Sequence, residues 1–270
     1  MTRFYYSTHH RNFGDALNPF LLERILQIPF EHSAFQNASM VGVGSLLQKC
    51  IAPRYAFFRR LAGHFKPEMR VMSTGFIRAV PAGQILIRKL DVRAVRGHET
   101  RQIIEKLTGA PCTAAVGDGG LLYPLLLDKL PAKKYAVGII PHYRDQQLPA
   151  VRELADRFKN AVIINVLDEP LEVLKTIAGC ERVLSSSLHG LIVADAMGIP
   201  NRHVMFSANV TGSDFKFRDY ASVFAPEDQL PALLPEEAMT LTDSDLFDPY
   251  RSKLPQIREL QQNLLSAMRS

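Results

Sequence analysis

The chain has 270 residues, of which 47% are hydrophobic and 22% charged, and its formal charge at pH 7 is +5. With a mean hydropathy of −0.02, it is expected to form a globular protein rather than a disordered chain. The longest apolar runs, such as Leu121–Leu127, are too short to cross a bilayer, and the N-terminus lacks the apolar core of a signal peptide. We therefore expect a cytoplasmic protein.

The basic excess and the cysteines narrow the class of protein further. The moderate positive charge suits a phosphorylated substrate or an anionic membrane surface, and no nucleic-acid-binding motif is visible. Cys50, Cys112 and Cys180 are too widely spaced, and odd in number, for a disulfide framework or a zinc ribbon. We expect them to be reduced packing residues, and we expect no nucleic-acid partner.

In the first half of the chain, short runs that predict strands alternate with polar turns and helical patterns. The predicted strands are Arg3–Ser7, Ser39–Leu47, Arg70–Ile77, Asp91–Val95 and Thr113–Val116. Apolar residues at helical spacing follow the first strand, from Leu17 to Leu26, and the fourth strand, from Ile103 to Leu107. Arg96 at the start of the second helix opposes the helix dipole, so a bound phosphate or carboxylate, or an ion pair, would explain it.

The stretch Lys49–Lys66 interleaves basic and aromatic residues. One interpretation is an interfacial helix that lies on anionic lipid, and the other is a helix whose aromatic face packs in the core. We favour core packing and keep peripheral membrane contact through 49–66 as the alternative. In that alternative, removing the charges of Arg59 and Arg60 should weaken binding to liposomes.

Tyr123–Lys134, which holds two prolines, is interpreted as the linker between two halves. The second half repeats the alternation, with predicted strands Tyr135–Ile140, Ala161–Val166, Glu181–Leu184 and Arg202–Phe206 and predicted helices Pro149–Phe158, Leu171–Ile177 and Leu254–Met268. The expected fold class is therefore α/β, with two Rossmann-like domains facing a cleft. The predicted domains are residues 1–130 and 131–235, followed by a C-terminal helical extension of residues 236–270.

Polar clusters follow several predicted strands at their carboxyl ends, where open parallel sheets bind ligands. The clusters are Asn12/Asp15, Arg96, Asp118, Ser185–His189 and Lys216/Arg218. The serines stand at a strand-to-helix turn whose backbone N–H groups can bind an anion, although serines there can also be plain helix caps. Asp15 either handles a sugar hydroxyl in the cleft or is only a first-turn acid. Because no set of metal ligands stands out, we expect no required metal.

Six short motifs occur in order and, together with Lys216–Tyr220, form a recognisable set. They are Asn12-Phe13-Gly14-Asp15, Val43-Gly44-Ser45, Ser73-Thr74-Gly75, Val95-Arg96-Gly97, Val116-Gly117-Asp118 and Ser185-Ser186-Ser187-Leu188-His189-Gly190. The set resembles the polysaccharide pyruvyltransferase family over roughly Tyr6 to Phe224. The resemblance implies a fold like the GT-B glycosyltransferases, with the first domain on the acceptor side and the second on the donor side.

The resemblance also implies an activity. Members transfer pyruvate from phosphoenolpyruvate to a sugar of an exopolysaccharide or cell-wall saccharide, commonly as a ketal that bridges two hydroxyls. The implied partners are phosphoenolpyruvate as donor substrate, with no further cofactor, and a saccharide acceptor. If that acceptor is lipid-linked, the protein works at the inner face of the membrane.

Three residues carry over directly from the family pattern. Asp15 matches the acidic residue of the first loop, Arg96 the arginine before the first-half helix, and His189 the histidine of the Leu-His motif. Many members have an arginine directly before Leu-His, where this chain has Ser187.

A substrate with both a carboxylate and a phosphate would suit two cations, so another residue is expected to replace the missing one. The candidates are Arg93, Lys216 and Arg218.

The resemblance leads to a mechanistic hypothesis in which protonated His189 is the general acid, because imidazole titrates nearest neutrality. Asp15 accepts the hydroxyl proton, and Arg96 with Ser185–Ser187 holds the phosphate or carboxylate. The expected substrate-binding residues are Asn12, Gly14, Asp118, Ser185, Ser186, Ser187, Leu188, Lys216 and Arg218.

Two other classes of function stay open. One is a glycosyltransferase that uses a nucleotide sugar on the same scaffold, since a fold does not fix a function. The other is a non-catalytic saccharide-binding subunit, against which the intact Asp15, Arg96 and His189 argue.

Overall fold

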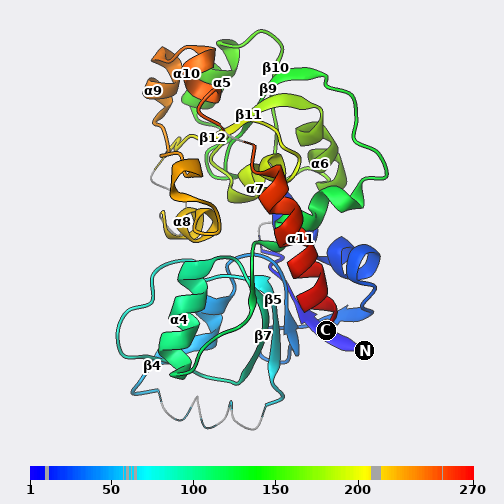
Figure 1. Cartoon of the computed structure of the whole chain (residues 1–270), viewed down its shortest axis with the longest axis vertical. Coiled ribbons are helices and arrows are strands. Elements are labelled where there is room, and N and C mark those ends of the chain that lie inside the picture. The colour runs from blue at the N-terminus through cyan, green and yellow to red at the C-terminus, as the bar shows by residue number, and fades with distance from the viewer. Residues whose placement is uncertain are drawn as a thin grey trace.

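A computed structural model describes residues 1–9, 12–56, 58, 61, 63, 66–207, 214–250 and 252–270. Two parallel sheets lie towards opposite ends of an elongated molecule (Figure 1). The first sheet contains β1 (Thr2–Tyr5), β2 (Phe30–His32), β3 (Met40–Val41), β5 (Met69–Thr74), β7 (Leu90–Val95) and β8 (Ala115–Val116). The second contains β9 (Tyr135–Ile140), β10 (Ala161–Ile163), β11 (Cys180–Ser185) and β12 (Asn201–His203). The predicted α/β class is confirmed.

The strand orders of the two sheets follow the same rule. The first runs β2-β1-β3-β5-β7-β8 and the second β10-β9-β11-β12, with parallel pairing throughout. In each sheet the first strand lies between the second and the third, so the order reverses beside that strand. Such a switch point opens a crevice at the carboxyl ends of the strands, because the two flanking connections leave in opposite directions. The chain therefore has two switch points, at β1/β3 and at β9/β11.

Helices cover the sheets and connect the two lobes (Figure 1). In the first lobe these are α1 (Phe13–Ala16), α2 (Asn18–Phe20), the π-helix η1 (Leu21–Leu26), the 3₁₀ helix η2 (Leu47–Cys50) and α4 (His98–Thr108). Next come the 3₁₀ helix η3 (Gly119–Leu126), α5 (Pro149–Asp156), α6 (Pro170–Ala178), α7 (Leu188–Ala196) and α8 (Phe215–Ala221). The last are the 3₁₀ turn η4 (Pro226–Asp228), α9 (Pro235–Thr240), α10 (Asp243–Phe247) and α11 (Leu254–Arg269).

The predicted linker Tyr123–Lys134 is wrong at its beginning. Tyr123 belongs to η3, is fully buried and packs with the apolar face of α7. Its hydroxyl donates to the carbonyl oxygen of Gly14 at 2.7 Å. The two prolines of this segment suggested an exposed connection. Pro124 instead lies inside the 3₁₀ helix η3, whose short turns need few backbone N–H donors, so the N–H that proline lacks is tolerated.

The stretch Lys49–Lys66 is not one helix with a core-facing aromatic side. Ile51–Pro53 forms β4, which pairs antiparallel with β6 (Gln84–Leu86). Tyr55 is 88% exposed and Phe58 is 82% exposed, so core packing is wrong for these two rings. Phe57, Phe65, Arg59 and Arg60 lie outside the described residues.

The predicted C-terminal amphipathic helix is confirmed as α11, which runs along both lobes (Figure 1). Its buried residues recur at helical spacing as Ile257, Leu260, Leu264 and Met268. It packs against β7 and β8 of the first lobe and against α7 of the second. The helix therefore ties the two sheets together, while α9 packs on α5 of the second lobe.

A second tie is a buried ion pair between the lobes. Asp219 of α8 accepts hydrogen bonds from Arg96 Nε at 2.8 Å, from Thr100 Oγ1 at 2.7 Å and from the Thr100 N–H at 2.8 Å. All three side chains are fully buried. A Cβ on Gly97 would lie 1.7 Å from the Asp219 carbonyl oxygen, so only glycine lets α8 approach the start of α4. Asp219 thus explains why Arg96 is tolerated at a helix N-terminus.

Replacing Asp219 by asparagine should lower the free energy of unfolding by about 3–5 kcal/mol, because it leaves the Arg96 guanidinium buried without a counter-charge. Urea denaturation followed by circular dichroism measures this. The matched control is Glu99→Gln, which breaks the exposed pair with Arg218 (3.2 Å) on the same two helices. It should cost less than about 1 kcal/mol, and equal costs for the two variants would contradict the assignment.

Candidate active site

A cavity of about 300 Å³ lies where the two switch points meet. Its walls come from the loops after β1, β3, β7, β8, β9 and β11 and from α8, so both lobes contribute. The lining residues that carry polar side chains are Ser7, Asn12, Asp15, Ser45, Arg96, Asp118, His142, Tyr143, Arg144, Ser187, His189 and Lys216.

The loop after β1 presents Asp15 to this cavity. Asn12 caps α1: its side-chain oxygen accepts from the Asp15 N–H at 3.2 Å, and its Nδ2 donates to Asp15 Oδ2 at 2.6 Å. The Phe13 N–H donates to the Val166 carbonyl oxygen of the second lobe at 2.7 Å, which fixes the loop across the cavity. Burial raises the pKa of Asp15 to about 6, against the opposing effects of the Asn12 hydrogen bond and the Lys216 charge.

His189 stands in the first turn of α7, directly against the loop that carries Asp15. A Cβ on Gly14 would lie 1.9 Å from His189 Nδ1, so only glycine at this position leaves room for the imidazole. The rings of Phe13 and Tyr123 flank it at centroid distances of 6.3 Å each. Its Nε2 is buried and has no hydrogen-bond partner in the described part of the chain.

The charge state expected for His189 is corrected by its surroundings. Burial, followed by the charges of Lys216 and Arg96, lowers the pKa of His189 to about 3. The imidazole is therefore neutral near pH 7 in the unliganded protein, and the protonated form assumed from its ordinary pKa is wrong for that state. Desolvation penalises the charged ring, and two nearby cations add to the penalty.

Asp118 faces the same space from the loop after β8. Its Oδ1 accepts from the Gly120 N–H at 2.8 Å, whereas its Oδ2 is buried without a partner among the described residues. A Cβ on Gly120 would lie 3.0 Å from Asp118 Oδ1 and 3.5 Å from His189 Cδ2, so the two side chains converge there. Burial raises the pKa of Asp118 to about 7, against the opposing effects of Arg96 and the Gly120 N–H. The site thus holds two orphaned buried polar atoms, which a bound ligand could satisfy.

The three candidates for the second cation, Arg93, Lys216 and Arg218, lie in different surroundings. Arg218 is a surface residue, with 62% of its side chain exposed, and pairs with Glu99. Arg93 pairs with Asp91 at 2.7 Å, far along β7 from the cavity. Lys216 lines the cavity and forms no ion pair in the described part of the chain. Of the three candidates, Lys216 alone is among the described residues that line the cavity, which favours it over Arg93 and Arg218, and its role as the second cation stays a prediction.

Lys216 is poised between two charge states. Burial, followed by the charge of Arg96, lowers the pKa of Lys216 to about 8, while Asp15 acts in the opposite direction. Its ammonium lies 5.2 Å from the centroid of the Phe217 ring. The guanidinium of Arg96 is held in place by more partners than the Lys216 ammonium. It donates to Ser45 Oγ at 2.7 Å, to the Phe76 carbonyl oxygen and to Asp219.

Two of the three serines serve the turn rather than the cavity. Ser185 Oγ is fully buried; it donates to the carbonyl oxygens of Ile140 and Ser187 at 3.0 and 2.9 Å. Ser186 Oγ is also fully buried; it accepts from the His142 N–H at 2.8 Å and donates to Asp145 Oδ2 at 3.3 Å. Neither is among the residues that line the cavity, and their contact with substrate stays a prediction. Within the segment 185–189, Ser187, Leu188 and His189 line it.

The structure therefore gathers most of the predicted site and adds a loop that the sequence analysis missed. The predicted residues that line the cavity are Asn12, Asp15, Arg96, Asp118, Ser187, Leu188, His189 and Lys216, with Gly14 directly behind the imidazole. The missed residues are His142, Tyr143 and Arg144, which follow β9. Their position after a predicted strand was the available signal.

Among the described residues, no group of three or more His, Cys, Asp or Glu side chains is placed to hold a metal ion. No helix in the described part of the chain has the length and apolar character needed to cross a bilayer. The expectation that no metal is required stays a prediction.

Comparison with known proteins places the chain in a family. Residues 71–205, half of the chain, match the family model described as polysaccharide pyruvyl transferase. The chain is also 28% identical over 224 residues to the succinoglycan biosynthesis protein ExoV of Rhizobium meliloti (strain 1021), covering 82% of this chain and 64% of ExoV. It is 27% identical over 220 residues to the uncharacterized protein L143 of Acanthamoeba polyphaga mimivirus, covering 80% of this chain and 72% of that protein. The chain thus spans just under two thirds of ExoV.

An α/β chain with two switch points around one polar cavity has the architecture of a small-molecule-binding or transferase protein. The match is more specific: this chain belongs to the polysaccharide pyruvyl transferase family. Arg96, Asp118 and His189 fall inside the matched residues, whereas Asp15 and Lys216 fall outside them and join the site only through the fold.

Changing Gly14 to alanine should lower the free energy of unfolding by about 1–3 kcal/mol, because the new methyl group overlaps the His189 ring. Gly14 lies in a helix and has no positive φ, so alanine carries no backbone penalty there. In a His189→Ala background the cost of the same change should be smaller, although the alanine Cβ would still lie 2.7 Å from the new methyl carbon. A double-mutant cycle by urea denaturation measures the coupling, and additive costs would show that the two residues do not touch.

Proposed function

We propose that this chain transfers pyruvate from phosphoenolpyruvate to a sugar of an exopolysaccharide or cell-wall saccharide precursor, forming a pyruvate ketal. The observation that carries the proposal is the interlobe cavity, where cations, two carboxyl groups of raised pKa and an imidazole converge. Family membership supports pyruvylation of a polysaccharide as the reaction class, and ExoV is a succinoglycan biosynthesis protein.

The charge of the cavity suits a small anionic donor. Arg96, Arg144 and Lys216 line it, and burial favours the uncharged forms of Asp15 and Asp118. Phosphoenolpyruvate carries a phosphate and a carboxylate, and each can take charge-assisted hydrogen bonds from such cations. In this proposal Lys216 supplies the second cation, in place of the arginine that many family members have at the position of Ser187.

The bound donor would also set the charge of the acid. Negative charge beside His189 favours the imidazolium and raises its pKa from the unliganded value. The raised pKa of Asp118 keeps a proton available nearby at neutral pH. In this proposal His189 becomes the general acid only when the donor occupies the cavity, because only then is the imidazole protonated near neutrality.

In this proposal the transfer of pyruvate proceeds by protonation, attack of a first hydroxyl, loss of phosphate and closure of the ketal. His189 delivers a proton to the methylene carbon, and the carbon that bears the phosphate becomes oxocarbenium-like. A sugar hydroxyl oxygen bonds to that carbon and gives its proton to Asp15, after which the carbon–oxygen bond to phosphate breaks. A second hydroxyl closes the ketal, and its proton leaves with the phosphate product. Raised above its ordinary value, the pKa of Asp15 suits a base that works near neutrality.

The proposal also covers the roles of the two domains and the location of the protein in the cell. We assign the acceptor side to residues 1–130 and the donor side to residues 131–235 in a GT-B-like arrangement, with residues 236–270 as a helical extension. For a lipid-linked acceptor, the exposed Tyr55 and Phe58 support peripheral contact with the inner face of the membrane through 49–66. Binding to vesicles of anionic lipid is the measurement that decides this contact.

The activity test is a coupled phosphate-release assay with phosphoenolpyruvate and the producing strain's own oligosaccharide intermediates. Wild-type protein should release phosphate only when saccharide is present, a dependence that a nucleotide-sugar glycosyltransferase or a binding subunit would not show. His189→Gln should lower kcat about 10²- to 10⁴-fold while donor binding stays measurable. Near-normal phosphate release from this variant would rule out His189 as the acid.

The KM for phosphoenolpyruvate should rise above about pH 8, where Lys216 loses its proton. The sign follows from the lowered pKa: the cation is present below that value and lost above it, by up to about tenfold per pH unit. Lys216→Arg should flatten this rise, because arginine keeps its charge. If Lys216→Arg retains the same pH dependence, another group holds the donor.

A further inference from the structure

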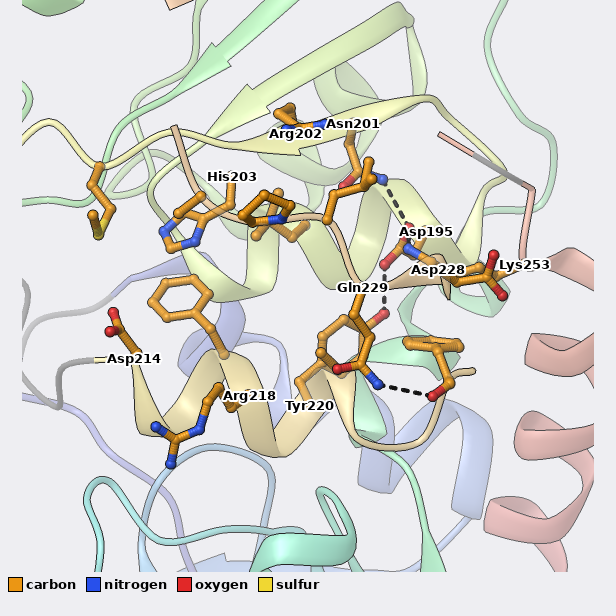
Figure 2. Close-up of a pocket in the computed structure, with 18 residues that line it drawn as sticks. Asp195, Asn201, Arg202, His203, Asp214, Arg218, Tyr220, Asp228, Gln229 and Lys253 are labelled. Carbon is orange, nitrogen blue, oxygen red and sulfur yellow. Dashed lines mark hydrogen bonds and ion pairs between the residues drawn. The ribbon is translucent and has the colours of Figure 1, made fainter. Parts of the chain in front are cut away.

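A second cavity, of about 480 Å³, lies beside α8 (Figure 2). It is enclosed by α8, by β12 and by the segment 228–232, and it reaches α7 at Leu191. Neighbouring residues in the first turn of α8 face the two spaces: Lys216 lines the interlobe cavity and Phe217 lines this one. The volume falls within the range of about 300–1,000 Å³ that small-molecule sites occupy.

One wall of this second cavity is aromatic and apolar. The rings of His203 and Phe217 stack at a centroid distance of 4.0 Å and an interplanar angle of 18°. Burial, with a contribution from Lys216, lowers the pKa of His203 to about 4, so both rings are uncharged near pH 7. Leu191, Met205 and Phe224 extend the apolar lining. Such a surface suits the C–H face of a ligand rather than a charged group.

Polar groups stand around the edge of the same cavity (Figure 2). Gln229 Nε2 donates to the Phe224 carbonyl oxygen at 3.0 Å, which fixes the amide and leaves its oxygen as an acceptor. The Asp228 side chain has no hydrogen bond or ion pair in the described part of the chain. Asp214 and Arg218 complete the edge. These groups can accept and donate hydrogen bonds to hydroxyls.

The two cavities differ in charge. In the second, three aspartates (Asp195, Asp214 and Asp228) balance three cations (Arg202, Arg218 and Lys253), and Asp195 is already bound by Tyr220, Asn201 and Lys253 at 2.8–3.1 Å. The interlobe cavity instead has cations facing carboxyl groups of raised pKa. An anion is therefore favoured in the first cavity, and a neutral ligand with many hydroxyls in the second.

We infer that the second cavity, although it lies in the second lobe, is a saccharide subsite that binds a further sugar residue of a long acceptor, which extends into it from the acceptor side of the first lobe. The inference rests on the proposed function, because it takes the ligand to be a saccharide. A pyranose ring has apolar C–H groups for Leu191, Met205 and Phe224 and hydroxyls for Asp228 and Gln229. The phosphates of a nucleotide would need several free cations, whereas Arg218 pairs with Glu99 and Lys253 with Asp195, which leaves Arg202 as the one lining cation without an ion pair in the described part of the chain.

The test uses two variants and one matched control on full-length protein. Asp228→Ala removes the polar edge, and Ala232→Trp fills the cavity from the segment beside β12. The control is Glu227→Ala, which alters the neighbouring exposed acid that does not line the cavity. The probes are pyruvate-free oligosaccharides of graded length, prepared by partial hydrolysis of the producing strain's exopolysaccharide.

For the longer oligosaccharides, both variants should raise the acceptor KM about tenfold, the effect of losing one good hydrogen bond or contact surface. The KM for phosphoenolpyruvate and the KM for the shortest accepted saccharide should not change, and kcat should fall less than about twofold. Glu227→Ala should behave as wild type. An Asp228→Ala variant that matches this control, or a KM rise independent of acceptor length, would overturn the subsite.

Direct binding separates this inference from the proposed function. If wild-type protein releases no phosphate with any acceptor, the proposed function fails, and saturation-transfer NMR with the same oligosaccharides still tests the cavity. Binding to wild type that is lost in Ala232→Trp supports the subsite. Equal binding by the two proteins, or no binding to wild type, overturns it.

Discussion

The carboxylate of Asp219 is the interaction on which the site depends most. It lies at the N-terminus of α4, where it accepts the Thr100 N–H and hydroxyl and neutralises Arg96. A negative charge at that position is favoured by the helix dipole, whereas Arg96 alone would oppose it. Because Asp219 belongs to α8, the same contact holds α8 against the first lobe. Lys216, one turn earlier in that helix, is thereby held in the cavity between the lobes.

The cavity shows how burial separates the charge states of neighbouring groups. The carboxyl groups of Asp15 and Asp118 have raised pKa values, and His189 and Lys216 have lowered ones, because each charged form loses solvation on burial. Near pH 7, Asp118 is therefore about half protonated and His189 is neutral, whereas Asp15 and Lys216 stay mostly charged. A bound anion changes this balance in favour of the cationic forms, so ligand binding and proton position are coupled. Pairs of groups with pKa values driven apart are typical of acid–base sites.

Helix α8 also divides the molecule's two main polar spaces. Lys216 contributes charge to one and Phe217 contributes an apolar ring to the other, although they are neighbours in sequence. The separation follows from helical geometry, since consecutive side chains point about 100° apart. One short helix thus presents different chemistries to the two cavities.

The sequence alone determined the α/β class, most strands, the closing amphipathic helix and the set of polar turns that follow strands. These features follow from local periodicity and from backbone chemistry, which near neighbours control. Tertiary structure decided the rest. Ser185 and Ser186 form hydrogen bonds with the end of β9 and the loop after it, Arg218 pairs with Glu99, and Lys216 lines the interlobe cavity. The sequence could not predict the neutral state of His189 either. Its lowered pKa comes from burial and from the nearby charges of Lys216 and Arg96, which are brought close to it only when distant segments fold together.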